Sequence, residues 1–210
     1  PTAHEVVASL KEQYGDAVVA VAVHATSVFG IPEGDPRGGL MLPDGNVYLS
    51  QWANPDNVSL PTGVVNRRGG LCDYSKWSTT VRDALAEDTQ VQLSIEADSV
   101  VGKDSIAIRV HLEPGVTVNA KLQLWVTENG IVARQRNGRQ TDRKYVHNHV
   151  YRGAVNGVGG EEVSLQKDMF LDFERGVQIK SEWNVENLSV VGFVYTEADG
   201  VLQAVECEVK

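Results

Sequence analysis

The tripeptide His147-Asn148-His149 places two imidazoles two residues apart, a spacing that could serve metal chemistry. On a strand, alternate side chains point to one face, so the two histidines could share a zinc ion. No third ligand follows from the spacing, and the alternative is a polar stripe that hydrogen-bonds a neighbouring loop. The letters also spell the name of a nuclease motif, but that motif consists of separated residues. We therefore assign no metal, and group His147, Asn148 and His149 with Arg152 as a polar cluster.

The two cysteines are the other candidates for chemistry. Cys72 precedes Asp73, and a neighbouring carboxylate disfavours the reactive thiolate. Cys207 belongs to the apolar set of an alternating segment, which predicts burial. The pair fits two free thiols as well as a disulfide, since both occur at such separations in sequence. We assign no catalytic residue and no cofactor.

The overall charge limits the possible partners. The chain has 210 residues and a net charge of -9, with 42% hydrophobic and 22% charged residues, as in an ordinary globular protein. A negative field repels phosphate backbones and anionic lipid, which argues against nucleic acid and against direct membrane-surface binding. No apolar run reaches the roughly 18 residues of a spanning helix. The partner we expect is a protein or another surface ligand.

The elements that must position these residues change in character along the chain. Apolar residues recur at helical spacing up to Gly15, which predicts a first helix. The run 17–23 is small and β-branched throughout, which is typical of a strand buried on both faces of a parallel sheet. Beyond it, the pattern predicts a long loop at 24–44, a short helix at 46–52, a strand at 64–67, a turn at Gly69-Gly70 and a helix at 78–86.

From residue 90 the apolar period becomes two. Alternation predicts strands around 91–95, 106–110 and 122–126, and later ones around 177–183, 188–195 and 201–209. Turn signals such as Asn129-Gly130 separate them. This pattern indicates an antiparallel β-sandwich. We therefore place a domain boundary near residue 89, between an α/β domain at 1–89 and a β-sandwich domain at 90–210.

The order of elements before that boundary resembles the thioredoxin fold with its first strand removed. The resemblance implies that Leu60-Pro61 is a cis bond and that Pro61 faces the active site. It also implies a Cys-x-x-Cys pair at or just before Pro1, outside residues 1–210. The missing strand is central in that fold, so we expect a strand from outside residues 1–210 between 17–23 and 63–67. Direct pairing of those two segments would instead indicate a different α/β fold.

A second resemblance covers nearly the whole chain. The first four residues, the stretch 61–67, and the stretches 124–128 and 145–153 resemble the twenty-eight-kilodalton outer-membrane lipoprotein family of anaerobic Gram-negative bacteria. The resemblance implies an outer membrane or cell-surface location, with membrane attachment only through a lipid anchor absent from this chain. It leaves two hypotheses: a binding or structural module, or a thiol-disulfide oxidoreductase whose catalytic cysteines lie upstream of residue 1.

Overall fold

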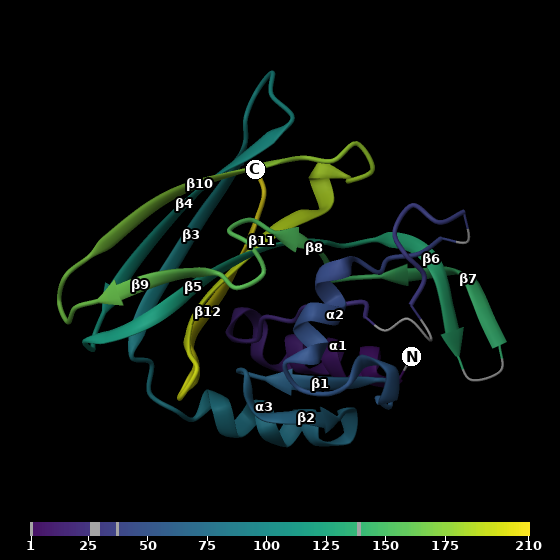
Figure 1. The fold of residues 1–210 in the computed structure, drawn as a ribbon, viewed down its shortest axis with the longest axis horizontal. Coiled ribbons are helices and arrows are strands. Elements are labelled where there is room, and N and C mark those ends of the chain that lie inside the picture. Colours follow the sequence, from purple (N-terminus) through teal and green to yellow (C-terminus); the bar gives the residue numbers. More distant parts are fainter. Residues whose placement is uncertain (1, 26–29, 37, 138–139) are drawn as a thin grey trace.

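The structure is a computed structural model that describes residues 2–25, 30–36, 38–137 and 140–210. Helices and one small hairpin gather on one side of a β-sandwich, as Figure 1 shows. The helices are α1 (Thr2–Tyr14), α2 (Pro43–Ser50) and α3 (Trp77–Leu85), and short 3-10 turns lie at Gly15–Ala17, Pro55–Asn57, Tyr74–Lys76 and Val185–Asn187. No described helix is long and apolar enough to cross a membrane.

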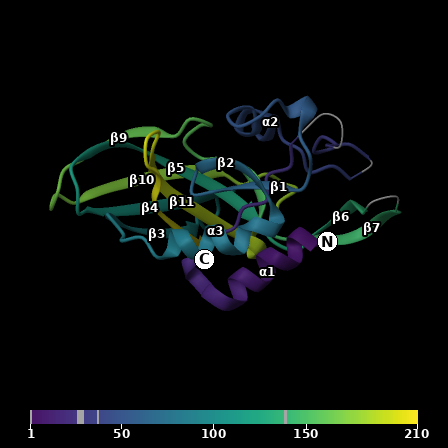
Figure 2. The same cartoon turned by 90° about the horizontal axis from the view of Figure 1, so that it is seen from below.

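The sandwich consists of two antiparallel sheets and confirms the β-sandwich prediction. The three-stranded sheet has the order β10-β4-β3, with β3 (Val91–Ser99), β4 (Ser105–Pro114) and β10 (Leu171–Gln178). The five-stranded sheet has the order β12-β11-β5-β8, and β9 also pairs with β5; its strands are β5 (Val118–Glu128), β8 (Val150–Ala154), β9 (Glu161–Leu165), β11 (Leu188–Thr196) and β12 (Gly200–Glu208). Figure 2 shows the hairpin of β6 (Ile131–Asn137) and β7 (Gln140–His147) to one side of the sandwich.

Two short strands share one edge of β5. β9 pairs with its first half and β8 with its last residues. Asn156, between these strands, bridges the gap with its side-chain amide: Oδ1 accepts from the backbone nitrogen of Leu124 and Nδ2 donates to the carbonyl of Leu122. The side chain thus satisfies backbone groups at the place where the ladder is interrupted.

The core between the sheets follows the alternation of the sequence. The inward residues of β4 and β5 are at most 2% exposed, namely Ile106, Ile108, Val110, Leu112, Leu122, Leu124 and Val126. Strand β11 does not follow this alternation, because both of its faces are buried. There Val191, Phe193 and Tyr195 contact Val19 and Val21 of the N-terminal part. The five-stranded sheet is therefore covered on both faces, by the other sheet and by the first part of the chain.

The predicted strand at 17–23 is not formed as expected. Only Ala22 makes a bridge, parallel to Val150 of β8. Its nitrogen donates to the carbonyl of His149 at 2.7 Å, and its carbonyl accepts from the nitrogen of Tyr151 at 3.1 Å. The apolar residues of this segment are covered by the outer face of the sandwich instead of by helices on both faces of a parallel sheet. The segment does not pair with the predicted strand at 63–67.

The N-terminal hairpin also differs in detail from the prediction. Strand β1 (Thr62–Val65) pairs antiparallel with β2 (Arg68–Asp73), so Gly69 and Gly70 lie within a strand. The turn is Asn66-Arg67, whose φ values of 48° and 53° are the left-handed pair that a two-residue hairpin turn requires. The sequence favoured the glycines as the turn because glycine adopts positive φ most readily. The described parts of the 24–44 loop contain isolated bridges, and residues 26–29 and 37 lie outside the described residues.

Candidate functional site

The Leu60-Pro61 peptide bond is cis, as predicted. Pro61 is exposed and immediately precedes β1. Thr62 Oγ1 and Trp77 Nε1 both donate to the carbonyl of Cys72 in β2, at 3.1 and 3.2 Å, so this carbonyl joins β1, β2 and the start of α3. The role of Pro61 as a residue facing an active site stays a prediction.

The His147-Asn148-His149 tripeptide is not a continuous strand. Strand β7 ends at His147, and His149 has a φ of 57° in the turn before β8. The side chain of Asn148 accepts from the nitrogen of Gly130 at 2.9 Å, and the nitrogen of His149 donates to Asn129 Oδ1 at 2.7 Å. These bonds brace the turn against the β5–β6 turn. The alternation that would place both imidazoles on one face of a strand is therefore absent.

The histidines instead meet the N-terminal part of the chain. The rings of His147 and His24 lie edge to face with centroids 5.4 Å apart, and Tyr145 packs between His147 and His4. Within the described residues, three buried imidazole nitrogens have no hydrogen-bond partner: Nδ1 of His24, Nε2 of His147 and Nδ1 of His149. Burial is the main cause that lowers the pKa of each ring, for His24 to about 4, and the neighbouring His147 lowers it further. These rings are neutral at pH 7.

Arg152 belongs to a separate buried network. Its guanidinium, 4% exposed, forms ion pairs with Glu33 Oε1 at 2.7 Å and with Glu128 Oε2 at 3.0 Å. Glu128 Oε1 also accepts from the nitrogen of Asn184, and Lys180 lies 3.6 Å from Glu33. The network joins the loop at residues 30–36 to the sandwich. The structure thus separates Arg152 from the histidines with which the sequence grouped it.

The two cysteines lie apart from the histidine cluster and from the Arg152 network. Both Cys72 and Cys207 are free. Burial raises the pKa of the Cys207 thiol, which holds it in the less nucleophilic protonated form. Over the described ranges of the chain, no group of three or more histidine, cysteine, aspartate or glutamate residues could hold a metal ion.

A groove of about 640 Å³ opens where the N-terminal part meets the end of the sandwich. Its walls come from residues 17–19, from the end of β1, from α3 and the segment after it, and from the start of β12. The lining combines apolar side chains with a polar surface, which includes carboxylates near the end of α3 and in the turn before β12. The lining residues are Ala17, Val18, Val19, Val64, Val65, Asn66, Arg68, Val81, Ala84, Leu85, Glu87, Asp88, Thr89, Gln90, Ala198, Asp199, Val201, Leu202, Gln203 and Ala204.

The hairpin turn fixes one wall of this groove. Arg67 stacks over the ring of Tyr195, 4.2 Å from its centroid, and donates to Gln51 Oε1 at 2.8 Å. The carbonyl of Asn66 accepts from the nitrogen of Val201 at 2.9 Å. Arg68 contacts the Glu87 carboxylate and a carbonyl in the turn before β12. These contacts hold β1 against the sandwich and keep the groove formed without a ligand.

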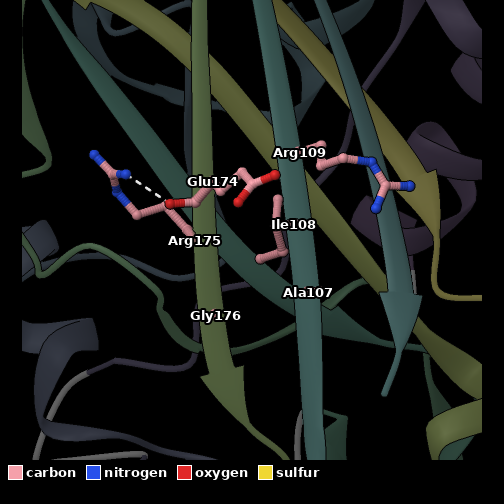
Figure 3. A pocket seen from close by; sticks show the side chains of 6 residues that line it. All are labelled: Ala107, Ile108, Arg109, Glu174, Arg175 and Gly176. Carbon is pink, nitrogen blue, oxygen red and sulfur yellow. Dashed lines mark hydrogen bonds between the residues drawn. The ribbon is translucent and has the colours of Figure 1, made fainter. Parts of the chain in front are cut away.

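A smaller hollow of about 310 Å³ lies on the surface of the three-stranded sheet, between β4 and β10 (Figure 3). Its two guanidinium groups point to opposite sides and already have acidic partners. Arg109 pairs with Glu96 and Asp98, and Arg175 pairs with Glu161. Because acidic partners already neutralise these charges, neither guanidinium is free to bind a ligand. The groove is therefore the better candidate site.

Comparisons with known proteins identify the family. The model of the family "Omp28: Outer membrane protein Omp28" matches residues 48–210. No curated protein is similar enough to the chain to count as a match. A solved domain of the outer membrane lipoprotein Omp28 from Porphyromonas gingivalis is 23% identical, with a TM-score of 0.42, over 59% of this chain and 91% of that one.

Two further solved structures resemble the fold. HBP35 of Porphyromonas gingivalis is 12% identical with a TM-score of 0.61, over 78% of this chain and 56% of that one. An Agrobacterium tumefaciens protein is 13% identical with a TM-score of 0.52, over 98% of this chain and 86% of that one. At these identities the likeness concerns the fold alone. Since the family model covers most of the sequence, the chain belongs to the Omp28 family of outer membrane proteins, which are located at the outer membrane or cell surface.

Proposed function

We propose that the chain is a non-catalytic binding module of an outer-membrane-associated surface protein, and that the groove binds a polypeptide ligand. The groove is the single observation that carries the proposal. It has the volume of a typical ligand site, apolar side chains beside polar groups in its lining, and a position where two parts of the chain meet. The solved P. gingivalis relative is described as a domain of an outer membrane lipoprotein. A lipid anchor outside residues 1–210 would hold the module at the membrane.

We further infer that the N-terminal part is a thioredoxin-like unit that lacks one strand. The order α1, extended segment 18–22, α2, β1, β2 and α3 agrees with that fold once its first strand is left out. The groove supports the inference, because it lies between residues 17–19 and the end of β1, where that strand would run.

The groove predicts a preference among peptides that a binding assay can measure. We expect a ten-residue apolar, β-branched peptide to bind, and acidic or proline-rich peptides of equal length not to bind, by fluorescence anisotropy. The substitution Leu85→Lys places a charge at one of the apolar residues of the lining, where Leu85 is 38% exposed, and should weaken binding about tenfold or more. Val101→Lys, at a residue that is 98% exposed and outside the groove, is the matched control. Equal binding by both variants, or no binding by any peptide, would refute the proposal.

We expect residues 1–210 to be inactive as a thiol-disulfide oxidoreductase. The two free cysteines are not arranged as Cys-x-x-Cys, and the Cys207 thiol is held in its protonated form. Dithiothreitol-coupled reduction of insulin should therefore proceed at the rate of the buffer alone, with thioredoxin as the positive control. A clear acceleration that Cys72→Ser abolishes would overturn this expectation.

A further inference from the structure

The β6–β7 hairpin concentrates positive charge in an acidic chain. Residues 131–147 hold five of the 19 lysine and arginine residues of the sequence and one of its 28 acidic residues. The hairpin segment is therefore net positive, whereas the whole chain carries a net charge of -9. The hairpin lies at one end of the longest axis of the molecule, to one side of the sandwich (Figures 1 and 2).

A β-bulge brings three of these cations to one level of the hairpin. The register shifts between Ala133 and Gln135, so that Arg134 of β6 faces both Arg143 and Lys144 of β7. Like charges that face each other across a strand pair destabilise it. No described carboxylate forms an ion pair with any of these three side chains. The bulge is therefore a place where an anion from outside the chain would relieve the repulsion.

Two exposed valines lie beside the cations. Val132 and Val146 are directly opposite each other in the hairpin, and they are 63% and 48% exposed. The next pair, Ala133 and Tyr145, points to the other face, because successive residues of a strand alternate. On that face Tyr145 contacts His4 of α1. The valine pair is thus on the face turned away from the N-terminal part, where it is open to a partner.

The negative charge of the rest of the chain does not cancel the charge of the hairpin. Asp142, the one acidic residue of 131–147, accepts from the backbone nitrogen of Lys144 at 2.8 Å and so braces the bulge. Exposed charges farther apart than the Debye length, about 8 Å at physiological ionic strength, are largely screened from each other. The net charge of -9 therefore does not exclude an anionic surface as the partner of this end of the molecule.

We propose that the β6–β7 hairpin docks on an anionic lipid surface, with Arg134, Arg143 and Lys144 against the headgroup phosphates and the two valines against the acyl boundary. Proteins of this family are located at the outer membrane or cell surface, where such a surface is at hand. Basic side chains near an anionic membrane each favour binding, and exposed apolar side chains add to it by leaving water. The valine pair favours lipid over an acidic polypeptide, which would match the cations alone. The hairpin shares no residue with the groove, so the two sites are independent.

Co-sedimentation with vesicles tests this proposal. Residues 1–210, without a lipid modification, should bind vesicles made of phosphatidylglycerol and phosphatidylcholine in equal parts, and bind vesicles of phosphatidylcholine alone at least about tenfold more weakly. The double variant Arg143→Gln/Lys144→Gln changes two exposed residues and should fold normally. Each cation is expected to contribute about fivefold, so this variant should bind the anionic vesicles about 25-fold more weakly. Equal binding to both kinds of vesicle, or equal binding by the variant, would overturn the proposal.

A matched variant separates the hairpin from the overall charge. Lys103→Gln/Lys167→Gln changes the net charge by the same amount at two exposed positions outside the hairpin. It should bind the anionic vesicles within about twofold of the unmodified chain, because distant exposed charges are screened. A loss as large as that of the hairpin variant would overturn the proposal. Binding to polyglutamate that the hairpin variant loses, with no binding to anionic vesicles, would assign the hairpin to an acidic polypeptide and also overturn it.

Discussion

Replacing Arg152 with methionine should lower the free energy of unfolding by about 3–5 kcal/mol, the loss expected when one member of a buried ion pair is removed. The guanidinium is 4% exposed and contacts both Glu128 and Glu33. Methionine keeps much of the volume but no charge. Glu128, 6% exposed, would then be a buried carboxylate without a cation, and only the backbone nitrogen of Asn184 would still stabilise it.

Urea unfolding followed by circular dichroism measures this effect, and a double variant tests its cause. Glu128→Gln removes the orphaned charge but keeps the oxygen that accepts from Asn184. In the background of Arg152→Met it should therefore recover a large part of the lost stability. Arg109→Met is the control, because Arg109 pairs with Glu96 and Asp98 on an exposed sheet face, where ion pairs contribute little. A double variant no more stable than Arg152→Met would show that packing, and not charge, explains the loss.

Acidification should destabilise the chain through His24 more than through any exposed histidine. Burial lowers the pKa of His24 from 6.5 to about 4, so the folded state favours the neutral ring. The stabilisation is complete above pH 6.5, where the ring is neutral folded or unfolded, and it is lost as the pH falls from 6.5 to about 4. A shift of that size corresponds to a loss on the order of 3 kcal/mol. Lowered pKa values at His147 and His149 act in the same direction.

The groups around these rings do little to compensate for protonation. Lys11 and His4 both lower the pKa of His149. Glu206 is the carboxylate that opposes them, 4.0 Å from His149 Nδ1, but it already binds Lys11 at 2.9 Å. We therefore expect the N-terminal part, which carries His4, Lys11 and His24, to separate from the sandwich as the pH falls.

Unfolding in urea at pH 7 and at pH 4.5 measures the loss, and two single variants assign it. His24→Gln should reduce the difference between the two pH values, because glutamine does not titrate. His111→Gln is the control of opposite sign: a hydrogen bond to Asp172 raises the pKa of this exposed histidine, so its contribution is present at low pH and is lost as the pH rises. If His24→Gln leaves the difference unchanged, the buried ring is not the acid-sensitive group.

The sandwich could be predicted from the sequence, because the signal is local. Ile106, Ile108 and Val110 alternate with Ala107 and Arg109 on one strand, and each of the three is buried in the core. The sharing of the β5 edge by β8 and β9 could not be predicted, since it depends on hydrogen bonds from Asn156 to Leu122 and Leu124. No periodic pattern in the sequence signals these contacts.

The N-terminal part was harder to predict because its partners are distant in sequence. The run 17–23 has the composition of a buried strand, but tertiary packing on β11 and a single bridge to β8 decide its conformation. The pairing of Arg152 with Glu33 and the contact of His24 with His147 could not be predicted either, because in each case the two residues are far apart in sequence. One signal was available for the first: an arginine inside the apolar segment at 150–154 requires an acidic partner.

Photo-crosslinking tests polypeptide binding in the groove most directly. The ten-residue apolar, β-branched peptide, with a benzophenone side chain at its central residue, is irradiated together with residues 1–210, and the cross-linked residues are mapped by mass spectrometry. We expect cross-links to residues that line the groove, at 17–19 and at 64–66, competed away by the unlabelled peptide and lost in Leu85→Lys. Cross-links confined to other surfaces would contradict binding in the groove.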